Sequence, residues 1–399
     1  MKKALFVASV ASMIDQFNLP NIRLLQDMGA EVDVACNFVK GNTCPQEKVQ
    51  QLLSLLDEMS VNCYQVDFDR HTSNVPGHIK AYSQMCAVLE GRKTPVNVPH
   101  HEGGGYAFVH CHSPIGGVVG RIAARKHGVR TLYTAHGFHF YTGAPLVNWL
   151  MFYPIEKALA RVTDALITIN REDYERALRN FPSGRVYYVP GIGIDLQKFH
   201  RGQIDIEAKR AELGVDASEI LMLSVGELIP RKGHETVIRA LGRMGAGTQN
   251  VQYLICGTGG LHDRLSALIH HEGLDGRIGF LGFRTDISEL CQAADLFVFP
   301  SRQEGLPVAL MEAIACKTPA LCSDIRGNRD LVQDRSCLFQ SGDVKGLTRI
   351  LQKLTRDGRN DLHRIMRGAI EDNYERLKKF DLHVVEGQMR EIYAGLLSS

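Results

Sequence analysis

Residues 296–313 read LFVFPSRQEGLPVALMEA, and this stretch decides the fold. It begins with a short apolar run, which is typical of a strand that is covered on both faces. A polar loop follows, and Pro307 then suits the first turn of a helix, because that turn leaves the backbone amide unused. A buried strand, a loop and a helix in this order form one repeat of a parallel α/β sheet.

The same alternation extends in both directions from this stretch. Apolar runs alternate with amphipathic segments of about 10–18 residues, which predicts parallel strands joined by right-handed helical crossovers. Two series of runs indicate two doubly wound sheets, with a break near the Pro190–Asp195 turn. We therefore expect an α/β fold with domains at residues 1–194 and 195–380, a terminal helix at 381–399, and a helix and surface loop within 69–105. The predicted strands are residues 4–10, 31–36, 63–68, 106–112, 131–136, 165–170, 186–190, 220–227, 251–257, 278–283, 296–301 and 319–324.

The composition is that of an ordinary globular protein. Hydrophobic residues make up 44% of the 399 residues and charged residues 23%, which excludes intrinsic disorder and a coiled coil. The 46 Lys and Arg nearly balance the 44 Asp and Glu, which argues against a nucleic-acid binder. No run reaches about 18 apolar residues, so no membrane span is expected, and the opening MKKALFVASVASM is interpreted as a buried strand in preference to a secretory signal. The 10 cysteines form no C-x-x-C pair, which indicates small buried side chains in a reducing compartment.

Two glutamates stand out in the stretch that decides the fold. Glu304 lies in the polar loop, and Glu312 lies in an otherwise apolar helix, where a carboxylate needs hydrogen-bond donors or a ligand. The backbone amides of residues 305–308 begin that helix and suit an anionic or hydroxyl-rich ligand. The alternative is two solvated glutamates on a helix surface.

Two turns that end earlier strands add polar groups. SVGELIPRKGH at 224–234 places Arg231 and Lys232 after a buried strand, where both suit phosphate oxygens, although a solvated basic turn is the alternative. CGTGG at 256–260 lacks the third glycine of a dinucleotide fingerprint. We interpret Gly257 and Gly259 as a tight turn that a ligand can approach closely.

Histidines end two strands of the first half. His110 and His112 lie on one strand face, as metal ligands can, but no acidic or cysteine partners complete a site, so no metal is predicted. His136, in the run TAHGFH at 134–139, is interpreted as a histidine that donates to a substrate, with buried structural histidines as the alternative.

An aromatic, amphipathic segment spans Leu146–Ala160. Packing against the core is the favoured interpretation, and a lipid-facing or acceptor-contacting face is the alternative. A cluster of cations lies on one predicted helix and in the segment that follows it. The cluster forms a solvated face or helps docking to anionic lipid. The cluster consists of Arg121, Arg125, Lys126 and Arg130.

The E-x7-E pattern of Glu304 and Glu312 resembles the signature of retaining glycosyltransferases of family 4, which have the GT-B fold of two Rossmann-like domains. The basic turn and the glycine turn fall in the order expected of that family, and the resemblance covers essentially the whole chain. The runs HCHSPIGG (110–117), YTAHGFHFYTGAP (133–145) and YPIEKALARVTDALITIN (153–170) are similar to a branch that builds bacterial capsular, exopolysaccharide or O-antigen repeat units.

The resemblance implies a role for each domain and for particular residues. Residues 1–194 would bind the acceptor, 195–380 the nucleotide-sugar donor, and the helix at 381–399 would cross back to the first domain. Glu304 and His136 would act beside the donor sugar. The family often has Gly-Arg where this chain has Gly226-Glu227, which makes Arg231 the substitute phosphate ligand. The implied donor-binding residues are Arg231, Lys232, Glu312, Gly305, Leu306, Pro307, Gly257, Gly259, Phe283 and Arg284, and the acceptor-side candidates are Asn18, His112 and His139.

The expected function is transfer of a sugar from a nucleoside-diphosphate sugar, UDP-linked, to a glycan on polyprenyl diphosphate. No metal or other cofactor and no nucleic acid are expected, and the protein is expected in the cytoplasm with peripheral membrane contact. The alternatives are a nucleotide-sugar 2-epimerase of the same architecture and a non-catalytic nucleotide-sugar-binding subunit. A dehydrogenase is disfavoured by the incomplete glycine fingerprint.

Overall fold

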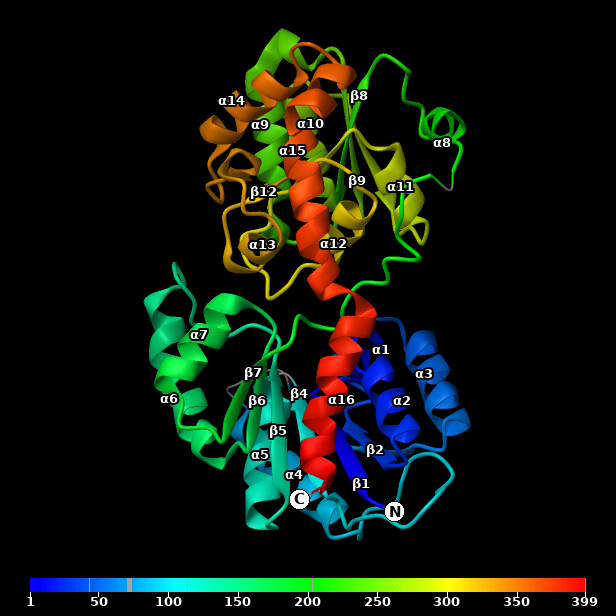
Figure 1. The fold of residues 1–399 in the computed structure, drawn as a ribbon, viewed down its shortest axis with the longest axis vertical. Coiled ribbons are helices and arrows are strands. Elements are labelled where there is room, and N and C mark those ends of the chain that lie inside the picture. The colour runs from blue at the N-terminus through cyan, green and yellow to red at the C-terminus, as the bar shows by residue number, and fades with distance from the viewer. Residues whose placement is uncertain (43, 70–73, 113, 203, 399) are drawn as a thin grey trace. The chain divides into compact units, whose positions relative to one another are not determined.

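The computed structural model describes residues 1–42, 44–69, 74–112, 114–202 and 204–398, which form two compact units. Unit 1 contains Met1–Gly193 and His383–Ser399, and unit 2 contains Ile194–Leu382. Each unit is a parallel sheet between helices, which confirms the predicted α/β class with two doubly wound sheets (Figure 1). None of the helices in the described ranges is both long and apolar enough to cross a membrane.

Unit 1 is built on a seven-stranded parallel sheet in the order β3-β2-β1-β4-β5-β6-β7. The first strand is central and buried along its whole length, as the apolar opening of the chain predicts. Chain order reverses beside it, since β2 and β4 pair with its two edges. The strands are β1 (Lys3–Val7), β2 (Glu31–Cys36), β3 (Asn62–Gln65), β4 (Phe108–His112), β5 (Arg130–Ala135), β6 (Ala165–Thr168) and β7 (Arg185–Tyr188).

Helices cover both faces of this sheet and bury two separate apolar layers. The last helix, α16, packs in the same layer as α1, α2 and α3, where Tyr393 stacks on Phe108. The other layer contains α4, α5 and α7. The helices are α1 (Ala11–Phe17), α2 (Leu19–Asp27), α3 (Gln46–Glu58), α4 (Val75–Leu89), α5 (Pro114–Lys126), α6 (Leu146–Leu159), the 3-10 turn η1 (Ala160–Val162), α7 (Arg171–Asn180) and α16 (Leu382–Ser398).

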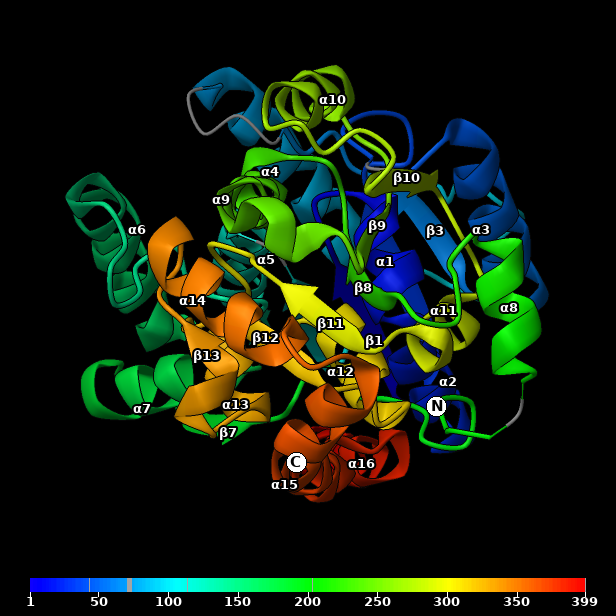
Figure 2. The same cartoon turned by 90° about the horizontal axis from the view of Figure 1, so that it is seen from above.

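Unit 2 is built on a six-stranded parallel sheet in the order β10-β9-β8-β11-β12-β13, which can be followed strand by strand in Figure 2. The last strand of this sheet was not predicted, because two residues are too few to show a hydrophobic pattern. The strands are β8 (Ile220–Val225), β9 (Val251–Cys256), β10 (Ile278–Gly282), β11 (Leu296–Phe299), β12 (Ala320–Ser323) and β13 (Leu338–Phe339). The helices are α8 (Ile206–Glu212), η2 (Pro230–Lys232), α9 (His234–Met244), η3 (Gly245–Thr248), α10 (His262–His271), α11 (Ile287–Ala293), α12 (Val308–Ala315), α13 (Arg326–Leu331), η4 (Arg335–Cys337), α14 (Val344–Thr355), α15 (Arg359–Leu377) and η5 (Lys378–Phe380).

One predicted feature of unit 1 is corrected by the structure. Arg121 does not belong to a solvated basic face, because its side chain is only 1% exposed. It forms a buried ion pair with Glu156 at 2.8 Å, and its guanidinium lies 3.8 Å from the centre of the Tyr133 ring. The physical reason is the position of Arg121 on the sheet-facing side of α5, one turn after Gly117. A Cβ at Gly117 would lie 2.5 Å from the Tyr133 ring, so glycine allows this close packing.

Candidate functional site

The polar groups of unit 2 gather where β8 and β11 end. These strands are neighbours and parallel, so the loops that leave their carboxyl ends meet at one edge of the sheet. Glu304, in the loop after β11, is buried and accepts hydrogen bonds from Lys232 Nζ at 2.8 Å and Arg231 Nη1 at 3.2 Å. Ser301 Oγ donates a third hydrogen bond to its carboxylate at 2.5 Å. Two cations and a hydroxyl therefore hold one carboxylate in place.

The basic turn η2 is fixed against the end of β11 by its backbone. Gly233 ends the turn with φ of 71°, and a Cβ there would lie 2.3 Å from the carbonyl oxygen of Pro300. The Arg302 amide donates to the carbonyl of Arg231 at 2.8 Å, and Arg231 Nη1 donates to the carbonyl of Gln303 at 3.0 Å. The turn that carries both cations is thus fixed, and the Arg231 side chain is held by a backbone carbonyl as well.

Glu312 lies in α12, and its carboxylate has no hydrogen bond or ion pair within the described parts of the chain. Burial raises its pKa from 4.5 to about 7, and the charge of Lys198 opposes this shift. A carboxylate in an apolar helix needs donors or a ligand, and the described part of the chain supplies no donor. Just before α12, the amides of Gly305 and Leu306 likewise have no acceptor among the described residues. Pro307 occupies the N-cap position of the helix.

The glycine turn after β9 has a packing reason for its composition. A Cβ at Gly257 would lie 2.1 Å from the carbonyl oxygen of Gly226, and one at Gly259 would lie 2.6 Å from that of Leu228. The turn and the loop after β8 are joined by a hydrogen bond from the Leu228 amide to the carbonyl of Thr258 at 2.9 Å. These contacts require glycine whether or not a ligand approaches, so the donor-binding role of the turn stays a prediction.

Phe283 and Arg284 follow β10 and differ in their surroundings. The Phe283 side chain is 76% exposed, which leaves its ring free to stack on a ligand. Arg284 donates to Asp286 Oδ1 at 2.7 Å and to Glu212 Oε1 at 2.9 Å. The guanidinium is therefore already committed to carboxylates, and Lys209 pairs with the same Asp286 at 2.6 Å.

Three further buried residues of this region were not predicted from the sequence. Arg326 Nε donates to the carbonyl of Glu304 at 3.0 Å and so holds the backbone of the loop after β11 in place. Asn328 donates to the carbonyl of Ser323 at 2.8 Å, and its own Oδ1 is buried without a partner in the described structure. His234 follows the basic turn and is buried beside the backbone of Gly226 and Glu227, and burial lowers its pKa to about 4. In the sequence, these three residues are marked only as polar residues within structured segments. Such residues are too common to identify a functional site.

The histidines of unit 1 lie where β4 and β5 end. His112 Nδ1 lies 3.1 Å from His136 Nε2, so one of these nitrogens donates to the other. His112 Nε2 is buried without a partner among the described residues. His110 Nδ1 lies 3.0 Å from Tyr393 OH and His110 Nε2 lies 2.8 Å from Thr134 Oγ1. These two contacts give His110 the role of a buried structural histidine. Burial lowers the pKa of all three, that of His136 to about 4, so the imidazoles are neutral.

The other two acceptor-side candidates are tied to nearby segments. Asn18 is fully buried and donates to the carbonyl of Met13 at 3.0 Å, while its Oδ1 has no partner among the residues described. His139 stacks on Phe152 at 4.5 Å. Ser113 of the predicted histidine motif lies outside the described residues. Within the described ranges, no cluster of three or more His, Cys, Asp and Glu side chains is arranged to hold a metal ion.

Comparison with known proteins covers both units. The family model for group 1 glycosyl transferases matches residues 205–372, and the glycosyl transferase 4-like domain matches residues 19–191. The chain is 34% identical over 361 residues to "Putative glycosyltransferase EpsD" of Bacillus subtilis (strain 168), with 88% of this chain and 87% of that protein covered. It is 30% identical over 285 residues to the UDP-Gal:alpha-D-GlcNAc-diphosphoundecaprenol alpha-1,3-galactosyltransferase of Escherichia coli, with 69% and 73% covered.

Solved structures show the same fold at low sequence identity. Anabaena Alr3699/HepE in complex with UDP has a TM-score of 0.71 at 20% identity, with 99% of this chain and 100% of that chain covered. Sucrose-phosphate synthase from Thermosynechococcus elongatus has a TM-score of 0.75 at 19% identity, with 100% and 99% covered.

Proposed function

The chain belongs to the group 1 glycosyltransferases of family 4, with the GT-B fold, and from this premise we propose that it transfers a sugar from a UDP-sugar to an acceptor sugar. The proposed acceptor sugar is carried on polyprenyl diphosphate, and the anomeric configuration of the transferred sugar is retained. The E. coli relative supports the choice of substrates, because its name contains both a UDP-sugar and a diphosphoundecaprenol-linked sugar. The sheet edge of unit 2 is the proposed donor site.

One observation supports this proposal above the others, namely the contact of Arg231 and Lys232 with Glu304 at the end of β8 and β11. Breaking a sugar–diphosphate bond builds negative charge on the leaving phosphate and positive charge on the sugar ring. Two fixed cations beside one fixed carboxylate provide groups of both signs at one place, and fixed charges act without costly reorganisation.

Glu304 is proposed to orient the donor sugar beside its reacting carbon, while Arg231 and Lys232 neutralise the diphosphate. The amides of Gly305 and Leu306 at the start of α12 add partial positive charge on the same edge. Retention does not require a covalent intermediate here, because the leaving phosphate can accept the proton of the acceptor hydroxyl on the same face of the sugar. No metal ion takes part in the proposed step.

Glu312 is proposed to bind the ribose of the nucleotide. Its carboxylate has no donor among the described residues, and two ribose hydroxyls would supply the hydrogen bonds that a half-buried carboxylate needs. This assignment also explains why a charged residue is retained in an otherwise apolar helix.

A thermal-shift measurement tests the donor site. Purified protein is heated with UDP-, GDP-, dTDP- or ADP-sugars, each with and without EDTA. At a hundred times the dissociation constant, a bound donor should raise the melting temperature by about 5–10 °C. We expect this shift only with a UDP-sugar, and EDTA should not abolish it. The control variant K345A should show the same shift, whereas K232A should show none. No shift with any nucleotide sugar would refute the donor assignment.

A transfer assay separates this function from its alternatives. The protein is incubated with a UDP-α-sugar and GlcNAc-diphosphoundecaprenol, and the anomeric configuration of the product is determined by NMR. An α-linked product supports retention, and a β-linked product refutes it. Conversion of the nucleotide sugar without acceptor would indicate an epimerase, and donor binding without turnover would indicate a non-catalytic subunit.

We propose in addition that unit 1 contacts the membrane surface through one face of α6. Trp149, Phe152 and Tyr153 pack inward, as the favoured interpretation predicted. The opposite face is apolar and exposed, with Leu146 and Leu150 each about 70% accessible. α6 lies at the outer side of unit 1 in both views (Figures 1 and 2). An apolar helix face of this kind, with a cation such as Lys157 at its end, suits an anionic bilayer. The remaining members of the exposed face are Val147, Met151 and Ile155.

Flotation with lipid vesicles tests this contact. The protein should float with vesicles that contain phosphatidylglycerol, and L146S/L150S should remain in the lower fraction. V39S, which removes an exposed apolar side chain elsewhere in unit 1, is the control and should float. Equal flotation of all three proteins would refute the role of α6.

A further inference from the structure

Two histidines contact each other at the carboxyl edge of the unit 1 sheet. His112 is the last residue of β4, and His136 follows the last residue of β5. Chain order reverses between β1 and β4, and open parallel sheets bind ligands outside the carboxyl ends of the strands at such a reversal. The contact between the two rings therefore lies where a substrate of this unit is expected.

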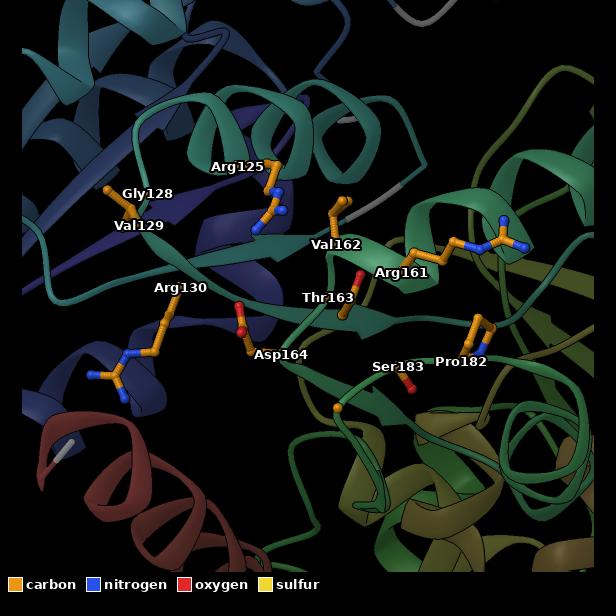
Figure 3. A pocket seen from close by; sticks show the side chains of 11 residues that line it. Arg125, Gly128, Val129, Arg130, Arg161, Val162, Thr163, Asp164, Pro182 and Ser183 are labelled. Atoms are coloured by element: carbon orange, nitrogen blue, oxygen red, sulfur yellow. The ribbon is translucent and has the colours of Figure 1, made fainter.

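The amino edge of the same sheet presents a contrast. A cavity of about 360 Å³ opens there, and Arg125, Arg161 and Ser183 are among the residues that line it. Figure 3 shows that the two guanidiniums point apart, so they do not meet around one ligand. The two histidines of the carboxyl edge, in contrast, do converge.

The His112 ring is held in place by its neighbours. His112 is only 1% exposed, and Phe6 stacks on its ring with 5.8 Å between the centres and 5° between the planes. The His110 ring lies 4.0 Å away, centre to centre, and is itself fixed by its hydrogen bonds with Thr134 and Tyr393. A hydrogen bond that His112 makes therefore has a fixed direction.

The contact between the two histidines holds a single proton. His112 Nδ1 and His136 Nε2 lie 3.1 Å apart. Burial keeps both imidazoles neutral, because it lowers the pKa of His112 well below its usual value and that of His136 to about 4. A neutral imidazole has one N–H group and one bare nitrogen. Either His112 donates to His136, or His136 donates to His112.

The second ring nitrogen of His112 favours one of these two arrangements. His112 Nε2 is buried, and it has no hydrogen-bond partner within the described structure. If His136 were the donor, His112 Nε2 would carry a buried N–H group without an acceptor. Such N–H groups are rarer in proteins than buried acceptors without a donor. The structure thus favours donation from His112 Nδ1–H, which leaves the proton of His136 on its Nδ1.

His136 is able to reach a ligand where His112 is not. His136 is only partly buried, and its Nδ1 has no hydrogen bond with any residue that the structure describes. An N–H group at this nitrogen is an uncharged donor that suits the oxygen of a sugar hydroxyl. The same ring cannot accept a proton from that hydroxyl, because its bare nitrogen is already bound by His112.

We propose that His112 is a positioning residue, which holds His136 in the tautomer with its proton on Nδ1 so that His136 donates to a hydroxyl oxygen of the sugar substrate. This inference rests on the proposed function. It agrees with the proposed mechanism, in which the leaving phosphate accepts the proton of the acceptor hydroxyl and no base is required from His136.

NMR of the full chain labelled with 15N-histidine tests the tautomer. Protonated and bare imidazole nitrogens differ widely in 15N chemical shift, and spectra of H112N and H136N identify the two rings among the 16 histidines. At pH 7 we expect the proton on Nδ1 of both rings. In H112L, which has no donor at this position, His136 should change to a mixture of tautomers. A proton on His136 Nε2 in the wild type, or an unchanged tautomer of His136 in H112L, would overturn the proposal.

Variants that keep or remove the donor test the positioning role. The side-chain amide of H112N can replace Nδ1–H as the donor, so its kcat should stay within about threefold of the wild type. H112D offers only acceptor oxygens and H112L offers neither, so both should lower kcat at least about tenfold. The Kd for UDP, which unit 2 is proposed to bind, should change less than about threefold. H271L removes an exposed histidine of α10 and should behave like the wild type in both measurements.

The two measurements fail in different ways. Circular dichroism first confirms that each variant is folded. Equal losses of kcat in H112N and H112L would overturn the positioning role, because the shape of the ring and not its donor would then matter. No transfer by the wild type from a UDP-sugar to GlcNAc-diphosphoundecaprenol would refute the proposed function. The NMR spectra would still confirm or overturn the tautomer, because they depend only on unit 1.

Discussion

Replacement of Glu312 by Gln should stabilise the protein at neutral and alkaline pH. Burial raises the pKa of Glu312 from 4.5 to about 7, so the folded chain binds this proton more tightly than the unfolded chain does. At about 1.4 kcal/mol for each pKa unit, ionising the carboxyl in the folded state costs at most about 3 kcal/mol. Gln has the same shape and never ionises, so E312Q should gain up to this amount above pH 7.

The pH window of this effect follows from the sign of the pKa change. Below pH 4.5 the carboxyl is protonated in both states and the substitution should be almost neutral. As pH rises from 4.5 to about 7, the unfolded chain releases the proton first, so the stability of the wild type falls relative to E312Q. Above about pH 7 the difference should be constant.

Urea unfolding followed by circular dichroism at pH 4.5, 6, 7 and 8 measures this difference. Because the chain has two units, the free energy is taken from the transition that E312Q moves. E391Q, an exposed carboxylate of α16, is the matched control and should change little at any pH. A loss of stability in E312Q at pH 8, or a gain that does not vary with pH, would refute the reasoning.

The same carboxyl should make nucleotide affinity depend on pH. If the ionised form accepts the ribose hydroxyls, the affinity of the wild type for a UDP-sugar, whose diphosphate does not titrate near neutral pH, should rise up to about tenfold for each pH unit between pH 5 and 7. The affinity of E312Q should be weak and independent of pH. Isothermal titration measures both, and parallel pH profiles in the two proteins would exclude Glu312 from nucleotide binding.

Three further outcomes are expected. Glu304→Gln should lower kcat with a UDP-sugar about a hundredfold or more while the Kd for UDP changes less than about threefold, and unchanged turnover would exclude the proposed role. Because burial lowers the pKa of His136 to about 4, the rate should show no titration of this imidazole between pH 5 and 8, and a limb near pH 6.5 that disappears in His136→Asn would contradict the neutral assignment. Arg121→Met should lower the free energy of unfolding by about 3–5 kcal/mol, because it leaves Glu156 charged and buried, and R121M/E156L should recover most of this loss. Urea unfolding of both variants checks the last point, which fails if the single variant costs less than about 1 kcal/mol.

The strands and the turns of unit 2 could be predicted because they are local properties. An apolar run, a polar loop and a proline within residues 296–313 predict a strand, its end and the start of a helix without reference to other parts of the chain. In a parallel sheet every carboxyl end lies at one edge, so this local pattern also indicated that Glu304 and Lys232 lie at the same edge.

The amino-acid sequence by itself thus determined the fold class, the positions of almost all strands and the family. Only the tertiary structure decided which side chains meet. Arg121 looked like its neighbours on a basic helix but is buried against Glu156, and Arg125, one turn later, lines a cavity with Ser183. The residues that come together here lie 35 to 58 positions apart in the chain, and their placement depends on strand order and on the direction in which each helix face points. Periodicity within one segment contains neither of these, because both arise from the packing of segments against each other.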